Sequence, residues 1–193
     1  MSFKQEFCIL AGLLAAAMTV SGEEILVNRD FSKSVNGVPA RWEYQKNRTK
    51  PEYKLNPAKG AEPANVEIKT PSETSQGLLM FRLRKKFPAG TRFTISGEYQ
   101  TSDVSFGRNG LILSSATGKY SQREAKQPTY WLNHALKPAE KWTSFRYSGR
   151  VKFPLEYVQY NVGLVGAKGT LRLRNLSVDV TLPSNTPDPK AEF

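Results

Sequence analysis

Two adjacent segments decide the fold class: KWTSFRYSGRVKFP at residues 141–154 and LEYVQYNVGLVGAKGTLRLRNLSVDV at residues 155–180. Apolar and polar side chains alternate along both, and a period of two requires an extended backbone with one buried face. In the first segment, the side chains expected on the buried face are Thr143, Phe145, Tyr147, Val151 and Phe153. Pro154 interrupts the pattern, and Gly166-Ala-Lys-Gly169 predicts a tight turn, so we expect three consecutive β-strands.

The remaining chain has short alternating or apolar runs separated by Gly- and Pro-containing turns, and no convincing helical periodicity. The further strands that we expect are at residues 24–31, 42–45, 52–55, 65–69, 79–84, 92–99 and 110–114. Residues 115–141 form the longest irregular stretch in this interpretation. Many short strands joined by such turns favour an all-β fold, and we predict an antiparallel β-sandwich rather than a barrel.

Residues 1–22 have the layout of an export signal. One basic residue, Lys4, precedes an apolar block from Phe7 to Val20, and small residues follow it. The block is shorter than the ~20 residues that a membrane-spanning helix needs. We therefore predict a signal peptide that is cleaved after residue 22. The alternative is an uncleaved anchoring helix, because Glu6 weakens the basic character of the N-terminal region.

Cleavage would leave a β-sandwich domain at residues 23–182, followed by a Pro-containing tail at residues 183–193 that we expect to be disordered. Cys8 lies inside the apolar block, so the mature chain would contain no cysteine and form no disulfide. We expect no transmembrane segment in the mature chain and a secreted or periplasmic location. The hydrophobic core alone would then hold the fold together.

The charge of the chain is strongly positive, with a formal net charge of +11 at pH 7. A surplus of this size favours anionic partners such as acidic or sulfated glycans, nucleic acid or anionic surfaces. Export makes nucleic acid the lesser partner. The alternative is that the basic surface only keeps an exported protein soluble.

A set of strands and turns distributed over residues 24–181 has a familiar order. Its parts are Leu26–Phe31, Trp42, Phe87–Gly90 leading to Phe93–Tyr99, Trp142, and Gly169–Val180. This pattern resembles galactose-binding-like jelly-roll domains, and among them the carbohydrate-binding modules associated with secreted cellulases and xylanases. The resemblance implies a jelly-roll β-sandwich, a polysaccharide or glycan as partner, and core positions for Trp42 and Trp142.

Modules of this kind often hold a structural calcium ion through acidic side chains near the first and final strands. Here Arg174-Asn175 stands where an acidic pair would be expected. An arginine opposes a hard cation that needs several oxygen ligands. Asp30 and Asp179 remain available as donors. We therefore expect no cofactor and disfavour a bound calcium ion.

The aromatic residues of the irregular stretch are candidates for ligand contacts. Sugar rings present C–H faces that stack on Trp or Tyr, while their hydroxyls need hydrogen-bonding side chains. The sequence QPTYWLNH at residues 127–134 supplies both, and binding groups concentrate on loops of a rigid scaffold. The predicted ligand-binding residues here are Trp131, Tyr130, Asn133, His134 and Tyr120. The alternative is that Trp131 only attaches a long loop to the sheet.

Arginines occupy alternate positions in three predicted strands, opposite the apolar face. They are Arg82, Arg84, Arg146, Arg150, Arg172 and Arg174. If these strands are neighbours, the arginines form one cationic surface that could grip carboxylate or sulfate groups with paired hydrogen bonds. The predicted ligand-binding residues from this set are Arg82, Arg84, Arg146 and Arg172. The alternative is that each arginine covers a solvated sheet face and discourages edge pairing.

Catalysis finds little support in the sequence. One histidine, no mature cysteine and no Gly-x-Ser-x-Gly motif leave no credible pair of nucleophile and base. We therefore predict an exported, non-catalytic carbohydrate-binding protein, for which an acidic or sulfated polysaccharide is a candidate ligand. The alternatives are a structural or adhesive envelope protein that uses the sandwich for protein contacts, and a glycan-cleaving enzyme on a jelly-roll scaffold.

Overall fold

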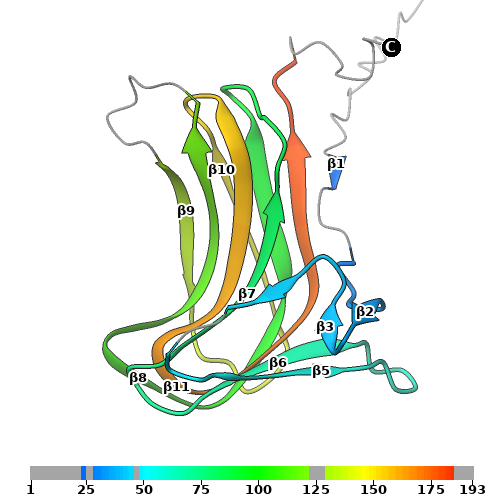
Figure 1. The fold of residues 1–193 in the computed structure, drawn as a ribbon, viewed down its shortest axis with the longest axis vertical. Coiled ribbons are helices and arrows are strands. Elements are labelled where there is room, and N and C mark those ends of the chain that lie inside the picture. Colours follow the sequence, from blue (N-terminus) through cyan, green and yellow to red (C-terminus); the bar gives the residue numbers. More distant parts are fainter. Residues whose placement is uncertain (1–22, 25–27, 46–47, 122–128, 185–193) are drawn as a thin grey trace, which may run out of the picture.

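The computed structural model describes residues 23–24, 28–45, 48–121 and 129–184, and its regular secondary structure there is entirely β (Figure 1). The strands are β1 (Glu23–Glu24), β2 (Ser34–Val35), β3 (Val38–Pro39), β4 (Glu43–Tyr44), β5 (Glu52–Asn56), β6 (Asn65–Thr70), β7 (Gln76–Leu83), β8 (Arg92–Tyr120), β9 (Thr129–Leu136), β10 (Thr143–Arg150) and β11 (Leu155–Thr181). Every pairing of strands is antiparallel. The predicted all-β, antiparallel fold is confirmed.

Two segments with sequence-based predictions lie outside this description. The predicted signal peptide at residues 1–22 is not among the described residues, and only residues 183–184 of the predicted tail are. None of the described residues belongs to a helix that could span a membrane.

Two long strands, β8 and β11, bend and contribute to two packed sheets. The first sheet has the order β4–β7–β11–β8–β9 and uses residues 155–165 of β11 with residues 111–120 of β8. The second sheet has the order β10–β8–β11–β6–β5 and uses residues 167–181 of β11 with residues 92–106 of β8. Figure 1 shows both long strands bending at the lower end of the view, where β5 and β6 lie.

The bend depends on glycines that let the two long strands approach closely. Val165 pairs with Leu111, but Ala167 already pairs with Phe106, so a bulge in β11 faces an irregular segment of β8. Gly166 has a φ of +56°, a conformation that glycine adopts without cost. The expected tight turn at residues 166–169 is therefore wrong, because the chain continues through this bulge as one strand that passes from one sheet to the other.

The core lies between the two sheets and joins large side chains from both. Phe93 of the second sheet contacts Tyr130 of the first, with ring centroids 6.2 Å apart. The Ser114 hydroxyl shares hydrogen bonds with the hydroxyls of Tyr147 and Tyr160, at 2.9 Å and 3.0 Å. Burial of each Phe, Leu or Ile side chain contributes about 1.5–3 kcal/mol. This core accounts for a fold held together by packing.

The two tryptophans predicted for the core differ. Trp42 is buried against Phe31, Phe81 and Tyr160, with centroid distances of 5.6, 5.6 and 6.2 Å, which confirms the prediction. Trp142 is only half-buried and lies on the outer side of the second sheet, so its prediction is wrong. The reason is its even position, because the alternation along β10 sends the even-numbered side chains outward and Phe145 inward.

The buried positions of β11 change phase at Arg174-Asn175, from Leu171 and Leu173 to Leu176, Val178 and Val180, because a bulge lies there. The pairing with β8 shifts between Arg174 and Ser177, and Asn175 has a φ of +51°. Glu98 of β8 accepts hydrogen bonds there from Arg174 Nε at 2.7 Å and from Asn175 Nδ2 at 3.2 Å. The bulge therefore brings two donors to one carboxylate.

The predicted irregular stretch at residues 115–141 is wrong for most of its length. β8 continues to Tyr120, and β9 begins at Thr129. Serine, threonine and lysine on the outer side of these strands give the segment the composition of a loop. As a consequence, Trp131 lies on β9, which is an edge strand of the first sheet.

Candidate functional site

The outer side of the first sheet carries a row of exposed and half-exposed side chains across four strands. Trp131 of β9 pairs with Thr117 of β8, which pairs with Gln159 of β11, which pairs with Arg82 of β7. Because alternation places all four on the same side, they form one line across the sheet, with strands about 4.8 Å apart. We call this line the Trp131 row.

A second line, the Asn133 row, runs beside the first. It joins Asn133, Ser115, Asn161, Met80 and Glu43 across five strands. Ser115 Oγ donates a hydrogen bond of 2.6 Å to Asn133 Oδ1. Ser115 and Asn161 are buried, so the line offers solvent an amide (Asn133) at one end and a carboxylate (Glu43) beside a half-exposed methionine at the other.

Hydrogen bonds between the two rows fix the polar side chains in place. Arg82 Nε donates to Gln159 Oε1 at 2.8 Å, and Arg82 Nη2 donates to the same oxygen. Gln159 Nε2 in turn donates to Asn161 Oδ1 at 2.6 Å. The Arg82 guanidinium also lies 5.8 Å from the ring centroid of Tyr157. A polar surface whose side chains are already oriented loses less conformational entropy when it binds a ligand.

Trp131 is the most exposed of the large aromatic side chains in the described part of the chain, at 62%. Its ring stands at the sheet edge, beside a small groove of about 320 Å³ that Arg150 and Lys152 also line. An indole left open to water is a platform for an apolar ring face. Together with the half-exposed Thr117 and Gln159 and the exposed Asn133, it can hold a ligand that has both C–H faces and hydroxyls.

The structure places only some of the ligand-binding residues predicted at residues 120–134 on the outer face of the first sheet. Trp131 and Asn133 lie on the outer face described above. Tyr130 points to the core, where burial raises its pKa to about 12, and its hydroxyl finds no partner among the described residues. Tyr120 is half-buried and packs on Tyr130, with centroids 6.4 Å apart. His134 is exposed, but its ring stacks on Tyr147 at 4.8 Å rather than facing the two rows.

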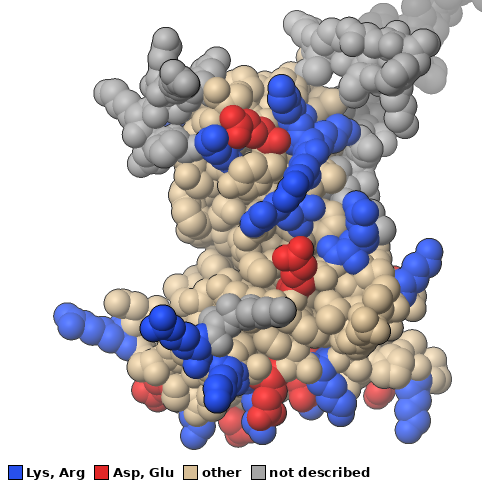
Figure 2. All heavy atoms as spheres, viewed as in Figure 1, with Lys and Arg blue, Asp and Glu red and all other residues tan. Residues whose placement is uncertain are grey.

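The arginines predicted to bind a ligand lie on two different sheets. Arg82 lies in the Trp131 row, and Arg84 is exposed just beyond the end of β7. Arg146 and Arg172 lie on the outer side of the second sheet instead. The six arginines therefore do not form one cationic surface. Figure 2 shows Lys and Arg prevailing on the upper part of one side of the molecule, while both signs mix along its lower edge.

The residues that the sequence reasoning missed are mostly neighbours of Trp131 in space. Thr117, Gln159, Asn161 and Met80 lie far from it along the chain. One signal was present, because the amides of Gln159 and Asn161 alternate with apolar residues in β11, which predicts that both point to the outer side of the sheet. Only the strand register places them beside the indole.

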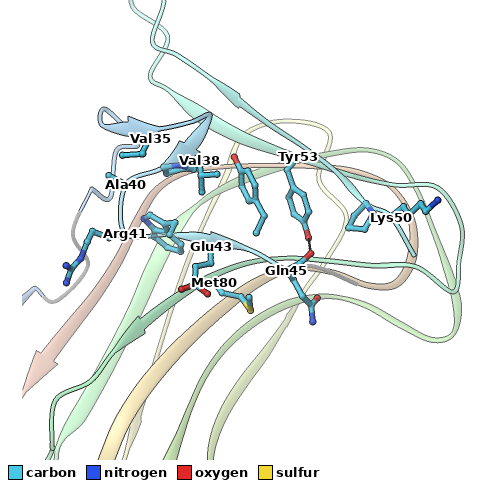
Figure 3. Close-up of a pocket in the computed structure, with 13 residues that line it drawn as sticks. Val35, Val38, Ala40, Arg41, Glu43, Gln45, Lys50, Tyr53 and Met80 are labelled. Carbon is cyan, nitrogen blue, oxygen red and sulfur yellow. Dashed lines mark hydrogen bonds between the residues drawn. The ribbon is translucent and has the colours of Figure 1, made fainter. Parts of the chain in front are cut away.

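A groove of about 1050 Å³ lies at the other end of the Asn133 row, between the β2–β3 hairpin, β4 and β5 (Figure 3). Tyr44 and Tyr53 stack face to face in its wall, 4.4 Å apart, and burial raises the pKa of Tyr44 to about 12. The Tyr53 hydroxyl donates to the carbonyl oxygen of Gln45 at 3.1 Å, as the dashed line in Figure 3 marks. Met80 and Glu43 belong to both the groove and the row, so the two surfaces are continuous.

The two acidic donors considered for calcium, Asp30 and Asp179, each accept hydrogen bonds from a nearby serine. Asp30 Oδ1 accepts hydrogen bonds from the backbone nitrogen and the hydroxyl of Ser32, at 3.2 and 2.9 Å, which together lower the pKa of Asp30. Asp179 Oδ1 accepts one from Ser177 Oγ at 3.2 Å. Among the residues that the structure describes, no group of three or more His, Cys, Asp or Glu side chains comes together.

This chain is similar to known proteins in its fold but not in its sequence. The sequence matches no protein-family profile and no curated protein. Among solved structures, a CBM22-1 xylan-binding domain from Paenibacillus barcinonensis Xyn10C is similar, with a TM-score of 0.58 and 13% identity, over 85% of this chain and 98% of that one. A CBM4 structure is similar with a TM-score of 0.52 and 11% identity, over 80% of this chain and 98% of that one.

A third similar structure is the enzymatically active domain of tailspike protein 4 from bacteriophage CBA120. Its TM-score is 0.60 at 9% identity, and the match covers 83% of this chain. This chain spans only 21% of that tailspike chain. At such low identities the likeness concerns the fold. It confirms the predicted resemblance to the jelly-roll β-sandwich of carbohydrate-binding modules.

Proposed function

We propose that this chain is an exported, non-catalytic carbohydrate-binding protein that holds a glycan on the outer face of its first sheet. The observation that carries the proposal is the Trp131 row, in which an indole that is 62% exposed stands in line with hydrogen-bonding groups oriented by one another. A sugar ring stacked on Trp131 would place its hydroxyls beside Thr117, and the next sugar of the chain would reach Gln159. The fold supports this role because carbohydrate-binding modules share it.

The charge of the surface favours an acidic or sulfated glycan. Arg82 and Arg84 lie on or beside the proposed face, and the chain as a whole carries +11. Lys119 is partly compensated by Glu156, since their charged atoms are 3.2 Å apart. A guanidinium can bind a carboxylate or sulfate through two parallel hydrogen bonds. An anionic glycan should therefore bind more tightly than its neutral counterpart.

The chemistry of the face favours binding over catalysis. The polar groups of the Trp131 row are a hydroxyl, an amide and an arginine, which can orient a ligand but supply neither a nucleophile nor a general acid. The proposed export rests on the layout of residues 1–22. Incubation with the glycans that bind should therefore release no new reducing ends, and release of such ends would contradict the non-catalytic assignment.

A glycan array followed by affinity electrophoresis tests the proposal. Wild-type protein should bind at least one glycan from a set that includes xylan, polygalacturonate and dextran sulfate. Trp131→Ala should weaken that binding roughly 30-fold, as expected for a central aromatic contact. Phe106→Ala is the matched control, because this ring is also exposed, at 38%, but lies at the bend of β8.

Two results would contradict the proposal. One is the absence of binding to every neutral and anionic glycan tested. The other is equal binding by wild type and Trp131→Ala, which would place any glycan elsewhere on the molecule. Thermal unfolding of both variants should stay close to that of the wild type, because exposed side chains contribute little to stability.

A further inference from the structure

The outer side of the second sheet has a hollow of its own, with a volume of about 820 Å³. Its walls come from β5, the loop at residues 57–63, β6, β8, β11 and Trp142. It lies on the opposite sheet from the Trp131 row and shares no residue with it. We call it the Trp142 hollow.

Strand register sets a line of charged side chains along the floor of this hollow. Lys54 pairs with Glu67, Glu67 with Arg172, and Arg172 with Gln100, so the four follow one another across β5, β6, β11 and β8. A single carboxylate therefore stands between two cations. Glu67 Oε2 accepts from Arg172 Nε at 2.8 Å.

Most N–H groups of the Arg172 guanidinium form no hydrogen bond with a described residue. Its Nε is the only nitrogen engaged with a described residue, and the side chain is 45% exposed. Both terminal amino groups of the guanidinium are therefore open to a ligand, and they are suited to a planar or tetrahedral oxyanion. Neither Lys54 nor Lys59 forms an ion pair within the described residues, so both ammonium groups are available as well.

Trp142 forms a rigid wall of the hollow because an arginine holds it. The guanidinium of Arg174 lies 4.0 Å from the Trp142 ring centroid. Glu98 Oε2 fixes the same guanidinium, accepting from Nε at 2.7 Å and lying 2.6 Å from Nη2. Arg174 is thus neutralised and acts as a support, while the indole borders the open volume.

The balance of charge selects the ligand. Apart from Arg174, which Glu98 neutralises, three basic residues line the hollow (Lys54, Lys59 and Arg172) against two acidic ones (Glu62 and Glu67), a surplus of one positive charge. An aromatic wall beside free cationic donors suits a sugar ring that carries an anion. We propose that the Trp142 hollow is a second binding site, for a sugar unit that bears a carboxylate or a sulfate group.

Two binding sites on opposite sheets would let one domain link two glycan chains. If the Trp131 row also holds a glycan, as proposed above, one domain can bind two anionic chains and bridge them. Bridging rests on that proposed function, whereas occupation of the Trp142 hollow does not. Linked sites convert modest affinities into strong retention on a polymer that engages both.

Titration calorimetry with the full chain separates these possibilities. The probes are short oligogalacturonates, which carry carboxylates, and short dextran sulfate chains, which carry sulfates, with plain dextran as the neutral reference. Lys54→Gln/Arg172→Gln removes two charges from the hollow. Arg92→Gln/Arg146→Gln is the matched control, since it removes two charges from the same side of the sheet outside the hollow.

Wild type and the control variant should bind two oligosaccharides per chain, and Lys54→Gln/Arg172→Gln should bind one. Affinity at the hollow should fall at least tenfold, because charge-assisted hydrogen bonds are lost. If Lys54→Gln/Arg172→Gln weakens the binding of only one of the two probes, the anion of that probe is the one that the hollow binds. Unchanged stoichiometry and affinity in Lys54→Gln/Arg172→Gln would overturn the second site.

The two proposals fail in different ways. Trp131→Ala should also bind one oligosaccharide, and the remaining one should respond to Lys54→Gln/Arg172→Gln. If Trp131→Ala behaves as wild type while Lys54→Gln/Arg172→Gln loses a site, the function proposed for the first sheet is wrong and the second site stands. Thermal unfolding confirms that each variant is folded before its stoichiometry is interpreted.

Discussion

The outer faces of the two sheets carry the same kinds of side chains in opposite arrangements. On the first sheet, the indole of Trp131 is 62% exposed, and Arg82 at the other end of its row bonds to a neutral amide. On the second sheet, the indole of Trp142 lies under Arg174, and that arginine is held by the carboxylate of Glu98. We infer that Arg174, which the partly buried carboxylate of Glu98 holds at two nitrogens, stabilises the fold, whereas the more exposed Arg82 and Arg172 are available to a ligand.

Replacement of Arg174 should give the largest effect on stability. Arg174→Ala leaves Glu98, whose side chain is only 28% exposed, without its main charged partner. We expect the free energy of unfolding to fall by about 1–3 kcal/mol, the cost of leaving a partly buried hydrogen-bonding group unsatisfied. Urea denaturation measures this loss.

The control for that experiment is Arg172→Ala, on the same strand. Its side chain is 45% exposed, and its ion pair with Glu67 is solvated, so stability should change by less than about 1 kcal/mol. Equal losses in the two variants would contradict the distinction between a supporting arginine and an available one.

Replacement of Arg82 should weaken glycan binding while leaving the stability of the fold almost unchanged. Arg82→Ala removes an exposed side chain whose bonds go to Gln159, so the free energy of unfolding should stay within about 0.5 kcal/mol. Affinity for an acidic glycan should fall about tenfold, because a charge-assisted hydrogen bond is lost. Arg146→Ala, on the outer side of the second sheet, is the control for binding at the first. A large loss of stability without loss of affinity would show that Arg82 is structural.

The sequence predicted the architecture well because side-chain alternation is a local property. Phe145 and the other inward residues of β10 are where the period of two puts them, and the phase change at Asn175 is a real bulge. The long strands were harder to predict. Gly166 looks like the residue of a tight turn, and only the contact with β8 shows that the strand passes through it.

The candidate site could be predicted only in part, for a similar reason. Trp131 and Arg82 were found by residue type, since aromatic and cationic groups bind glycans. Thr117 and Gln159 could not be, because their proximity to Trp131 depends on the register of three strands. Tyr130 was chosen as a neighbour of Trp131 in sequence. Adjacent residues of a strand point to opposite sides, and Tyr130 therefore faces the core.

An increase in salt concentration should weaken glycan binding by a smaller factor than Trp131→Ala or Arg82→Ala does. Exposed charges are screened when the Debye length falls from about 10 Å at 0.1 M to about 3 Å at 1 M ionic strength. Binding of oligogalacturonate should therefore weaken several-fold over this range, while binding of a neutral glycan on the Trp131 row should change little. Titrations at a series of NaCl concentrations measure both. Identical salt dependence for the two ligands would mean that the arginines do not contact the anion.

The smallest effect expected is a change in how stability depends on pH, and it tests the second sheet alone. Burial raises the pKa of Glu98, but the hydrogen bonds from Arg174 and Asn175 and the charge of Arg174 outweigh it, so the pKa of Glu98 lies below its ordinary value of 4.5. Between the folded pKa and 4.5, the unfolded chain binds more protons at this residue than the folded chain, and stability rises with pH. The stabilisation is present above about pH 4.5 and is lost as the pH falls through the folded pKa.

Glu98→Gln should remove this contribution. The difference in free energy of unfolding between wild type and Glu98→Gln should be largest near neutral pH and should shrink as the solution is acidified below pH 4.5. Urea denaturation at a series of pH values measures it, with Glu52→Gln on the edge strand β5 as the matched removal of a carboxylate. If the difference stayed constant across this range, the carboxylate of Glu98 would not be what holds Arg174 over Trp142. The contrast between the two faces would then rest on packing rather than on charge.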